Sequence, residues 1–559
     1  MVSRIDQYHF YEREWESYEQ LRESFEWEIP EMLNMAEYVC DRWARERGRV
    51  AFFAENESGD RRAVAFRDVQ RDANRLANYL SEEGVAAGDR IGICLGQRPE
   101  AAVAHVAAWK LGAVSVPLST QFGDDALAYR LDDCRATACV VGNASAETLR
   151  SVRDDLEALE TVVTVDTEPT ATETSWDALE TRASRRFETT ATNADDDAII
   201  IYTSGTTGDP KGVLHAHRLL LGHLPTFAEA FIDRGTTDGT VFWTPVEWSW
   251  IGSLFSLVMP ALYYGRPVVA YDADRFDAES AFELLERYEV TDFGAPPTAL
   301  RMMMQLDAPA EKYDLASVHR VGAGGEAVGE SVVDWVADTF DGAPLEELFG
   351  QTEANLVIGD CSSLKRPRPG KMGLAAPGHE VAIVDPETAE PIDEPGEIGE
   401  IAVRYEGDPV CFEEYWKKRD LTDRKVRNGW LLTEDLGSVD EDGFFSFEGR
   451  KDDVIITSGY RVSPEEIEET IASHASVADV AVIGIPDDER GTVPKAFVVV
   501  ADDGRPTAEL EETLETRVKD RLAPYEYPRE IQFIEELPKT STGKIRRKSL
   551  REREGVANS

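Results

Sequence analysis

The sequence predicts an α/β protein with a large N-terminal domain, made of two α/β subdomains and a small antiparallel β unit, followed by a small α+β C-terminal domain. The 559 residues correspond to three or four folding units at roughly 150 residues each. Helix and strand patterns alternate over residues 35–141 and again over 198–350. After residue 350, apolar and polar residues alternate at every second position, as in strands. The pattern changes once more near residues 450–453, which predicts domains at 1–451 and 452–559.

The first section alternates between helix and strand signals. The segment AFRDVQRDANRLANYLSEEG predicts an amphipathic helix that ends at Gly84, and RIGICL predicts a buried strand after it. The segments AAVAHVAAWKLGA and SVPL then predict another helix and another strand. Alternation of this kind favours a parallel sheet covered by helices.

The next stretch, residues 167–197, is acidic and rich in Thr and Ala, so we expect a loop or crossover with little packing. A second α/β section runs from Ala198 to Gly350. Beyond it, EVAIVD, GEIGEIAVR and GFFSFEGR alternate at period two between Gly and Asp turns. These segments predict the small antiparallel β unit.

The chain is strongly acidic. Its 59 basic and 107 acidic residues give a formal charge of −48, which repels phosphate backbones and anionic lipid and excludes general nucleic-acid or membrane-surface binding. Acidity can accompany disorder, but 42% hydrophobic and 9% aromatic residues indicate a globular fold. The basic residues are 14 Lys and 45 Arg, and a carboxylate excess with scarce Lys indicates a halophilic protein whose self-repulsion is screened by salt.

The cysteines and the apolar stretches indicate a cytoplasmic protein. Six scattered cysteines form no CxxC pair and no metal-ligand spacing, so we expect free thiols in a reducing compartment. The N-terminus is polar and acidic, unlike a secretory leader. The least polar stretch, Trp250 to Tyr264, is too short and too interrupted to cross a bilayer, so we expect no membrane span.

The most informative segment is IIIYTSGTTGDPKG, residues 199–212, in which a buried strand runs into a hydroxyl- and glycine-rich loop with one lysine. Glycines let backbone N–H groups turn toward an anion, hydroxyls add donors, and Lys211 adds positive charge. Polyphosphate fits such a loop, although the segment is not a Walker loop, because GxxxxGK[ST] does not match. The alternative is a strand-to-loop turn without a ligand.

Five motifs together resemble one family. YTSGTTGDPKG, LEELFGQTEAN, LTEDLG, EGRKDDVIITSGYRVSPEEIE and LPKTSTGKIRRK stand in the order and spacing of the adenylate-forming enzymes, over roughly residues 35 to 550. This family includes acyl-CoA synthetases, aryl-CoA ligases, luciferases and peptide-synthetase adenylation domains. The tail LAPYEYPREIQFIEELPKTSTGKI looks most like medium-chain acyl-CoA synthetases. The resemblance implies Mg²⁺ as cofactor and two steps: a carboxylate and ATP give an acyl adenylate, and coenzyme A then displaces AMP.

The resemblance also implies the nucleotide site and the catalytic residues. Lys544 would bridge carboxylate and α-phosphate, and Lys211 and Glu353 complete the catalytic set; the alternative for Lys544 is a solvated lysine in a basic tail. Thr203 and Glu353 resemble the metal pair, since Mg²⁺ prefers oxygen ligands. The implied ATP/AMP-binding residues are Thr203, Ser204, Gly205, Thr206, Thr207, Gly208, Asp209, Pro210, Lys211, Gly325, Glu326, Ala327, Glu347, Leu348, Phe349, Gly350, Gln351, Thr352, Asp435, Arg450 and Lys544.

Three of these residues have both a functional and a structural interpretation. Phe349 should place its ring against adenine, and the alternative is a buried core side chain. Asp435 should accept hydrogen bonds from both ribose hydroxyls, because a carboxylate has two acceptor oxygens. Arg450 resembles its partner at the ribose and phosphate, and a structural salt bridge is the competing interpretation.

For the thioester step, the resemblance implies a mobile C-terminal domain. Asp452 occupies the family's hinge position, about which the domain would swing to withdraw Lys544 and present SGYRV. Gly459 would line the pantetheine tunnel, where any side chain would narrow it. The implied CoA-binding residues are Ser458, Gly459, Tyr460, Arg461, Arg490, Gln121, Lys519 and Arg529.

The acyl pocket decides the substrate. Acetate-specific relatives carry tryptophan where this chain has Gly350, so glycine should leave room for several methylenes, each worth about 0.8 kcal/mol on burial. The expected pocket residues are Trp248, Trp250, Gly350 and Thr352, although both tryptophans fit a core equally well and PVEWSWIGSLF departs from the usual Asp-x-Gly-Trp pattern.

The leading hypothesis is therefore an acyl-CoA synthetase for medium-chain acids. The alternatives are an aryl-CoA ligase, an acetyl- or propionyl-CoA synthetase, a stand-alone adenylation domain that loads a carrier protein, and a nucleotide-binding regulator without catalysis.

Overall fold

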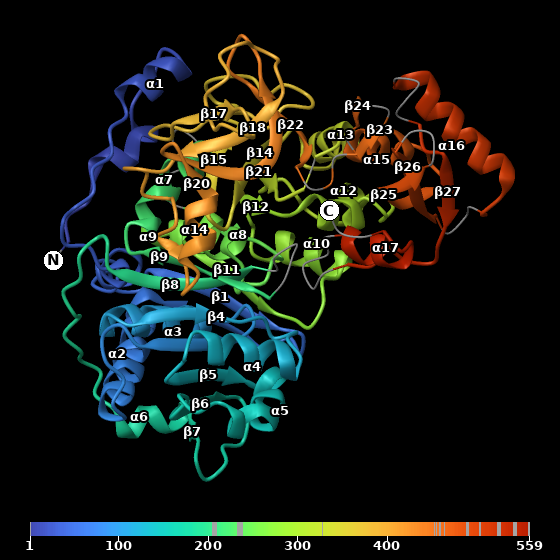
Figure 1. The fold of residues 1–559 in the computed structure, drawn as a ribbon. Coiled ribbons are helices and arrows are strands. Elements are labelled where there is room, and N and C mark those ends of the chain that lie inside the picture. Colours follow the sequence, from blue (N-terminus) through green and yellow to red (C-terminus); the bar gives the residue numbers. More distant parts are fainter. Residues whose placement is uncertain are drawn as a thin grey trace.

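The computed structural model describes residues 2–203, 209–231, 239–326, 328–451, 453, 455–457, 460–462, 464–487, 491–501, 505–522, 527–539 and 545–556. A large body contains three sheets, and a smaller one, red in Figure 1, holds the C-terminal residues. This agrees with the predicted fold class. The N-terminal residues precede the sheets with η1 (Asp6–Glu12), α1 (Tyr18–Ser24) and η2 (Glu37–Asp41).

The first α/β layer is an eight-stranded sheet covered by helices: six consecutive strands run parallel, as predicted for residues 35–141, and the two pairings at one end of the sheet are antiparallel. The predicted helix at 65–84 is α2, and α3 is buried on every side. In sheet order its strands are β19 (Glu414–Tyr415), β9 (Lys211–Ala216), β8 (Asp197–Thr203), β4 (Val114–Pro117), β3 (Arg90–Cys94), β5 (Ala138–Gly142), β6 (Thr161–Val165) and β7 (Thr174–Ser175). The helices of this part are α2 (Phe66–Glu82), α3 (Pro99–Leu111), α4 (Asp124–Asp133), α5 (Asn143–Val152), η3 (Arg153–Asp155), η4 (Trp176–Ala178) and α6 (Leu179–Arg182).

The expectation of a loop or crossover with little packing in residues 167–197 is confirmed in part, because only Thr174, Leu179, Thr192 and Ala194 of this stretch are buried, but it is not all loop. This stretch carries β7, η4 and α6, and it packs along α2. Asn78 of α2 donates hydrogen bonds to the carbonyls of Ser184 and Arg186, and the Tyr79 hydroxyl bonds to Thr174. The Asn78 side chain satisfies backbone carbonyls of a segment whose own sequence has little hydrophobic pattern, and Tyr79 adds a side-chain contact.

The second layer is a nine-stranded sheet. In sheet order its strands are β16 (Leu374–Ala375), β15 (Ala354–Gly359), β14 (Leu345–Gln351), β13 (Arg320–Gly324), β12 (Asp292–Gly294), β10 (Phe242–Trp243), β11 (Val268–Asp272), β1 (Val50–Asn56) and β2 (Arg61–Ala65). The helices are α7 (Leu219–Phe231), α8 (Ile251–Ser253), η5 (Leu254–Val258), α9 (Met259–Tyr263), α10 (Ala278–Arg287), α11 (Pro297–Met303), α12 (Pro309–Lys312) and α13 (Glu330–Thr339).

The predicted antiparallel β unit is a five-stranded sheet. It consists of β17 (Val381–Val384), β18 (Gly399–Arg404), β21 (Trp430–Val439), β20 (Val426–Arg427) and β22 (Phe445–Arg450), with α14 (Arg419–Lys425) beside it. The C-terminal body contains β23 (Ile455–Thr457), β24 (Tyr460–Val462), α15 (Pro464–Ala472), β25 (Val477–Asp487), β26 (Gly491–Val500), α16 (Ala508–Arg521), β27 (Glu530–Phe533) and α17 (Arg547–Arg553).

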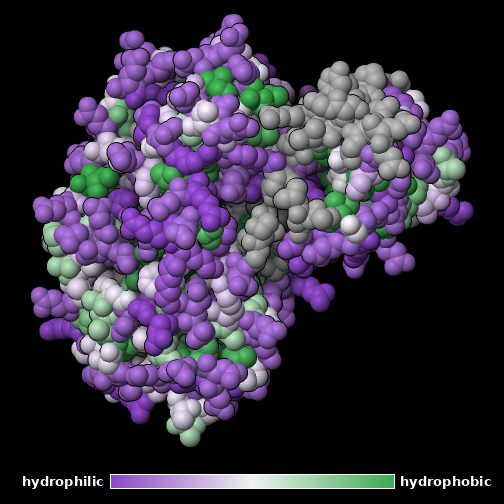
Figure 2. Space-filling model, viewed as in Figure 1, coloured by the Kyte–Doolittle hydropathy of each residue, from purple (hydrophilic) through white to green (hydrophobic). Residues whose placement is uncertain are grey.

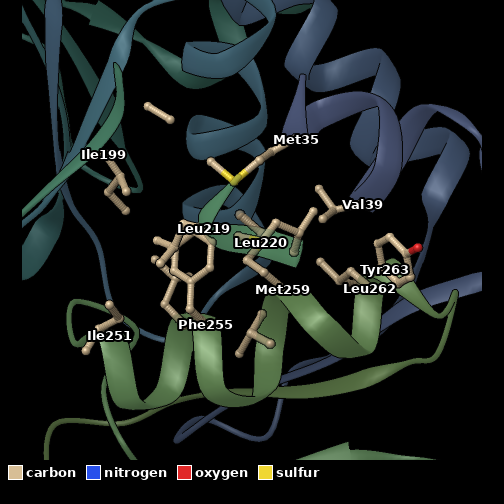
Figure 3. Close-up of a cluster of buried hydrophobic side chains, with 14 of the residues drawn as sticks. Met35, Val39, Ile199, Leu219, Leu220, Ile251, Phe255, Met259, Leu262 and Tyr263 are labelled. Carbon is tan, nitrogen blue, oxygen red and sulfur yellow. The ribbon is translucent and has the colours of Figure 1, made fainter. Parts of the chain in front are cut away.

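The main core joins the first two layers. Figure 3 shows the helical segment α8–η5–α9 turning Ile251, Phe255 and Met259 toward Leu219 and Leu220 of α7. Aliphatic and aromatic residues recur at helical spacing here, so one face of the segment is fully packed and its position is fixed. Some residues of this segment, Ile251 and Leu257 among them, both belong to this core and border a cavity.

The visible surface is mostly hydrophilic (Figure 2). Among the described residues, no helix is both long enough and apolar enough to cross a membrane.

Candidate active site

A cavity of about 2680 Å³ lies where the sheets of the large body face the C-terminal body. From the large body it is lined by the ends of β8, β9, β13 and β14 and by the middle of β21, and from the C-terminal body by α15 and by Ile545 and Arg547. These strands belong to three sheets that border one space, so residues far apart in the sequence reach it. Of the described expected site residues, these line it: Thr203, Lys211, Gly325, Glu326, Glu347, Leu348, Phe349, Gly350, Gln351, Thr352, Glu353, Asp435, Arg450, Gln121 and Trp250.

The loop that the sequence predicts to bind phosphate connects two paired strands. Strands β8 and β9 form an antiparallel hairpin in which Thr203 stands opposite Lys211, so the hydroxyl and the lysine mark the two feet of the loop. Pro210, the residue before Lys211, has its carbonyl bonded by the Tyr129 hydroxyl at 3.0 Å and by Lys418 Nζ at 3.1 Å. Asp209 is exposed beside it. The intervening Ser204, Gly205, Thr206, Thr207 and Gly208 lie outside the described residues.

Glu353 is held from two sides. The Tyr415 hydroxyl donates to Glu353 Oε1 at 2.5 Å, and Phe412 N donates to the Glu353 carbonyl at 2.9 Å. The carboxylate of Glu353 and the hydroxyl of Thr203 are both oxygen donors on the cavity wall, which is the donor chemistry that Mg²⁺ prefers. Among the described residues, no group of three or more His, Cys, Asp or Glu side chains is arranged to hold a metal by itself. The donor set therefore fits a cation that shares its shell with phosphates and water.

The turn after β13 approaches β14 closely. A Cβ at Gly324 would stand 2.2 Å from the Leu348 carbonyl oxygen, and Gly325 has a φ of +84°, so both positions require glycine. The Glu326 carboxylate accepts hydrogen bonds from Thr298 and Arg301 at 2.7 and 2.8 Å, which fixes this turn. The next residue, Ala327, lies outside the described residues.

Strand β14 carries Glu347, Leu348 and Phe349 to the cavity. Burial, with a further contribution from Asp360, raises the pKa of Glu347 well above its usual range. Phe349 is half-buried and also packs against the main core. The ring therefore packs against the core, as the structural interpretation predicts, and also lines the cavity. Its contact with adenine stays a prediction.

A small polar network connects β14 with β21 and β22. Gln351 Nε2 donates to the Thr433 carbonyl at 2.8 Å and reaches Asp435 Oδ2 at 3.5 Å. Asp435 stands opposite Arg450 in the β21–β22 register, and Arg450 Nη1 lies 3.3 Å from Asp435 Oδ1. Asp435 and Arg450, which we expect at the ribose, therefore lie together at the cavity. They also form the salt bridge that the structural interpretation predicts.

The two tryptophans of the expected acyl pocket are separated. Trp248 is 2% exposed, packs against Phe52 with ring centroids 5.6 Å apart, and does not line the cavity, so its assignment to the pocket is wrong. Trp250 does line the cavity, together with Ile251, Gly252, Ser256 and Leu257 of the same helical segment. The chain turns here, with Trp250 N donating to the Glu247 carbonyl at 3.3 Å, and the two side chains have different surroundings.

The interpretation of Gly350 also needs correction. A Cβ there would stand 2.2 Å from Leu356 N, in the backbone of the paired strand β15, and would not enter open space. Glycine is required at this position by the close approach of two strands. By contrast, a Cβ at Gly252 would meet nothing within 4 Å.

Two buried histidines contact the chain where β14 leads into β15. His215 Nε2 lies 2.7 Å from the Thr352 carbonyl, and burial lowers the pKa of His215 to about 4. Asn355, on the cavity wall, donates to Ser256 Oγ at 2.8 Å and contacts His223 Nε2 at 3.1 Å. These contacts fix the backbone that carries Thr352 and Glu353.

The expected CoA residues are only partly within the described chain. Gln121 is exposed at the cavity, where its N–H donates to Ser119 Oγ at 3.1 Å. Lys519 Nζ and Arg529 Cζ lie 4.1 and 4.0 Å from the centroid of the Tyr527 ring in the C-terminal body; neither residue lines the cavity, although the neighbouring Arg521 and Leu522 do. For Tyr460 and Arg461 only the backbone is described, in β24. Asp452, Ser458, Gly459, Arg490 and Lys544 lie outside the described residues, although Ile545, next to Lys544, lines the cavity.

Two cavity residues were missed by sequence reasoning. Tyr415 contacts both Glu353 and Lys211, whose Nζ lies 5.1 Å from the centroid of the tyrosine ring. Glu247 accepts hydrogen bonds from Ser119 Oγ and Thr120 N, both at 2.7 Å. An aromatic residue in a strand normally indicates core, and one glutamate among many carries no signal, so neither residue could be singled out from the chain alone.

Comparisons with known proteins agree with this geometry. The family model of the AMP-binding enzyme matches residues 40–416, and that of the AMP-binding enzyme C-terminal domain matches residues 466–544. The chain is 34% identical over 506 residues to an uncharacterized acyl–CoA ligase, YtcI, of Bacillus subtilis (strain 168), covering 90% of this chain and 93% of that one. It is 32% identical over 554 residues to the mitochondrial acyl-coenzyme A synthetase ACSM3 of Mus musculus, covering 97% and 94%.

Solved structures give the same result. The anthranilate CoA ligase AuaEII in complex with anthranoyl-AMP superimposes with a TM-score of 0.86 at 27% identity, covering 94% of this chain and 98% of that one. An acyl-CoA synthetase of Brucella canis superimposes with a TM-score of 0.74 at 30% identity, covering 96% and 99%.

Proposed function

The chain belongs to the AMP-binding enzyme family as an AMP-forming carboxylate–CoA ligase, and from this premise we propose that it activates medium-chain carboxylic acids. The observation that carries the proposal is the apolar wall of the cavity. Trp250, Ile251 and Leu257 line it, and Gly252 among them leaves open space at its Cα. Each methylene buried against such a wall contributes about 0.8 kcal/mol.

The reaction has two steps. A carboxylate oxygen of the acid attacks the α-phosphorus of ATP, and pyrophosphate leaves. The sulfur of coenzyme A then attacks the acyl carbonyl carbon, and AMP leaves with the electron pair of the broken C–O bond. We assign Lys211 to the leaving phosphates and Lys544 to the carboxylate and α-phosphate, because negative charge accumulates there.

We assign Asp435 to the ribose and Phe349 to the adenine face. The support is their common position on one cavity wall, where Gln351 and Arg450 hold Asp435 in place. A carboxylate with two acceptor oxygens suits a pair of neighbouring hydroxyls.

Thr203 and Glu353 are the residues that would hold Mg²⁺. The ion would supply positive charge to the phosphate oxygens of ATP. The support is the oxygen donor set on the cavity wall beside the feet of the phosphate loop.

The domain boundary and the CoA side belong to the same proposal. Strand β22 ends at Arg450 and β23 begins at Ile455, so a boundary at 451/452 falls between two sheets. Rotation about Asp452 would exchange Lys544 for Ser458, Gly459 and Tyr460 at the acyl adenylate.

A second substrate class has specific support. The anthranilate CoA ligase structure matches 94% of this chain with a TM-score of 0.86, and an indole on the cavity wall, Trp250, offers a face for stacking an aromatic ring. An aryl acid is therefore the alternative substrate.

Two further assignments rest on the whole chain. All six cysteines are free and buried, which supports a reducing compartment such as the cytosol. The charge of −48 supports a halophilic working environment.

The test is AMP release with and without coenzyme A, across straight-chain acids from acetate to dodecanoate and with benzoate and anthranilate. We expect CoA-dependent turnover whose kcat/KM is greatest at medium chain length. A maximum at acetate or at an aryl acid would overturn the medium-chain assignment. AMP release that does not depend on coenzyme A would overturn the thioester step.

A further inference from the structure

Residues 414–418 are fixed against β9, the strand that begins at Lys211. Strand β19 pairs with β9, with Tyr415 opposite Val213, and Trp416 N donates to the Gly212 carbonyl at 2.7 Å. A Cβ at Gly212 would stand 3.2 Å from the Trp416 Cβ, so the two backbones are in close contact. Residues 414–418 therefore move with the foot of the phosphate loop.

Tyr415 turns from this segment into the site. It is 3% exposed, and its hydroxyl donates to Glu353 Oε1 at 2.5 Å. Hydrogen bonds to a carboxylate at such distances are among the strong ones. The face of the same ring receives Lys211, with Nζ 5.1 Å from the centroid. One side chain thus contacts both the metal-side glutamate and the phosphate-side lysine.

Lys418 contacts the same end of the loop, at the residue before Lys211. Its Nζ donates to the Pro210 carbonyl at 3.1 Å, and the Tyr129 hydroxyl of α4 donates to the same oxygen at 3.0 Å. Lys418 Nζ also lies 3.2 Å from the Tyr129 hydroxyl. Two donors from different elements therefore fix the peptide immediately before Lys211.

We propose that Tyr415 and Lys418 are positioning residues of the adenylation step: Tyr415 orients Glu353 and Lys211, and Lys418, with Tyr129, fixes Pro210 at the foot of the phosphate loop. The proposal rests on the function proposed above for that loop and for Glu353. Preorganised groups aimed at developing charge lose their effect when their supports are removed. The thioester step releases no pyrophosphate, so it does not need the contacts of Tyr415 and Lys418.

The first variant is Tyr415→Phe, which removes the hydroxyl and keeps the ring for Lys211. We expect the kcat of ATP–pyrophosphate exchange to fall about 10- to 100-fold, as is typical when a side chain that orients a metal-binding residue is removed. The rate of thioester formation from supplied acyl adenylate should stay within about twofold of wild type. Tyr415→Leu, which also removes the ring face, should lower exchange further.

A binding measurement complements the kinetics. By calorimetry, Mg²⁺ should strengthen ATP binding less in Tyr415→Phe than in wild type, whereas ATP binding in EDTA should be unchanged. The matched control is Tyr405→Phe, whose hydroxyl donates to the Glu413 carbonyl at 2.8 Å and does not reach the cavity. This control should leave both measurements unchanged.

Lys418→Met tests the other contact. We expect the KM for ATP to rise about tenfold, and ATP to bind more weakly both with Mg²⁺ and in EDTA. The control is Lys417→Met, because Lys417 Nζ donates to the Asp133 carbonyl at 2.5 Å and not to Pro210. Tyr129→Phe should act in the same direction, and the double variant with Lys418→Met should be less than additive, since both donors bind one oxygen.

The outcomes separate this inference from the proposed function. If wild-type protein fails to exchange pyrophosphate with medium-chain acids, the proposed function is wrong. If wild type exchanges normally and Tyr415→Phe and Lys418→Met do so as well, the positioning inference is wrong. Equal losses in both half-reactions, or loss of melting temperature with unchanged Mg²⁺ and ATP binding, would also overturn it, because they indicate a purely structural role.

Discussion

Two glycines on the cavity wall have opposite surroundings. At Gly350 a Cβ would collide with the backbone of β15, 2.2 Å from Leu356 N, whereas at Gly252 it would enter open space. Only the second position allows a side chain to be added without moving the backbone. Gly252, which follows Trp250 and Ile251 on the wall, is therefore the place to test the depth of the acyl pocket.

We expect Gly252→Phe to shorten the range of acids. Losing room for about four methylenes removes about 3 kcal/mol of burial, which corresponds to roughly a hundredfold in kcat/KM for octanoate relative to acetate. Kinetics with both acids and a constant KM for ATP would check it. An unchanged ratio would place the acyl chain elsewhere in the cavity. The comparison variant Gly350→Ala should instead lower stability, with the ratio preserved.

Asp360 allows a residue-scale test of buried charge. Its Oδ2 accepts a hydrogen bond from Glu347 N of β14 at 3.1 Å, and its Oδ1 has no hydrogen-bond partner among the described residues. Burial, with a smaller contribution from Glu346, raises the pKa of Asp360 to about 7. In the unfolded chain an aspartate titrates near ~3.9, so between pH ~4 and 7 the folded state binds the extra proton. The stability that this proton supplies is lost as pH rises through 7.

We expect Asp360→Asn to remove this pH dependence. The free energy of unfolding of the variant, relative to wild type, should rise between about pH 5 and pH 8, by on the order of 3 kcal/mol at most. Urea unfolding of both proteins at each pH and at one salt concentration would measure it. A difference that is constant with pH would show that Asp360 is already ionised in the folded protein at pH 5.

At the scale of elements, the cavity has walls on two bodies. Strand β14 contributes Glu347, Phe349 and Gln351, and the C-terminal body contributes α15 and Ile545. A wall made by two bodies changes when one of them rotates, which is how one site can serve two reactions in turn. Ile545, which lines this wall, is the residue after Lys544 in the sequence.

We expect Lys544→Ala and Gly459→Leu to have opposite effects. Without the lysine, adenylation should be lost and thioester formation from supplied acyl adenylate should be nearly intact. With leucine at 459, pyrophosphate exchange should persist and acyl-CoA production should stop. Separate assays of the two half-reactions would show it. Equal losses of both in either variant would contradict a rotation of the C-terminal domain.

The whole molecule carries a charge of −48, and hydrophilic side chains dominate the face shown in Figure 2. Self-repulsion at this density acts against the folded state and is screened by salt, since the Debye length falls from about 10 Å at 0.1 M to about 3 Å at 1 M. Some ion pairs are buried, such as Arg320–Glu346, or partly buried, such as Lys110–Asp41, and are therefore less affected by screening.

We expect melting temperature and activity to rise from about 0.1 to about 2 M KCl, because repulsion among carboxylates is reduced more than the buried pairs are weakened. Thermal unfolding across this range would measure it, with KCl replaced by an uncharged osmolyte at equal osmolality as the control. A melting temperature independent of KCl would contradict halophilic adaptation.

The sequence by itself determined the elements and the family. The period of its apolar residues predicted α2, β3, α3 and the antiparallel sheet, and five motifs in order identified the adenylate-forming enzymes. Such signals are local, because backbone preference and side-chain period depend on neighbours within a few positions. The cavity residues Thr203, Lys211, Glu353 and Asp435 followed from the motifs for this reason.

Only the tertiary structure decided what each side chain faces. Trp248 packs in the core against Phe52, and glycine is required at position 350 because the backbone of Leu356 lies so close. The contact of Tyr415 with Glu353 spans 62 positions, and no local pattern records it. Which residues border a cavity depends on how elements distant in the sequence pack, since the same side chain is core or wall according to the neighbour that packing brings to it.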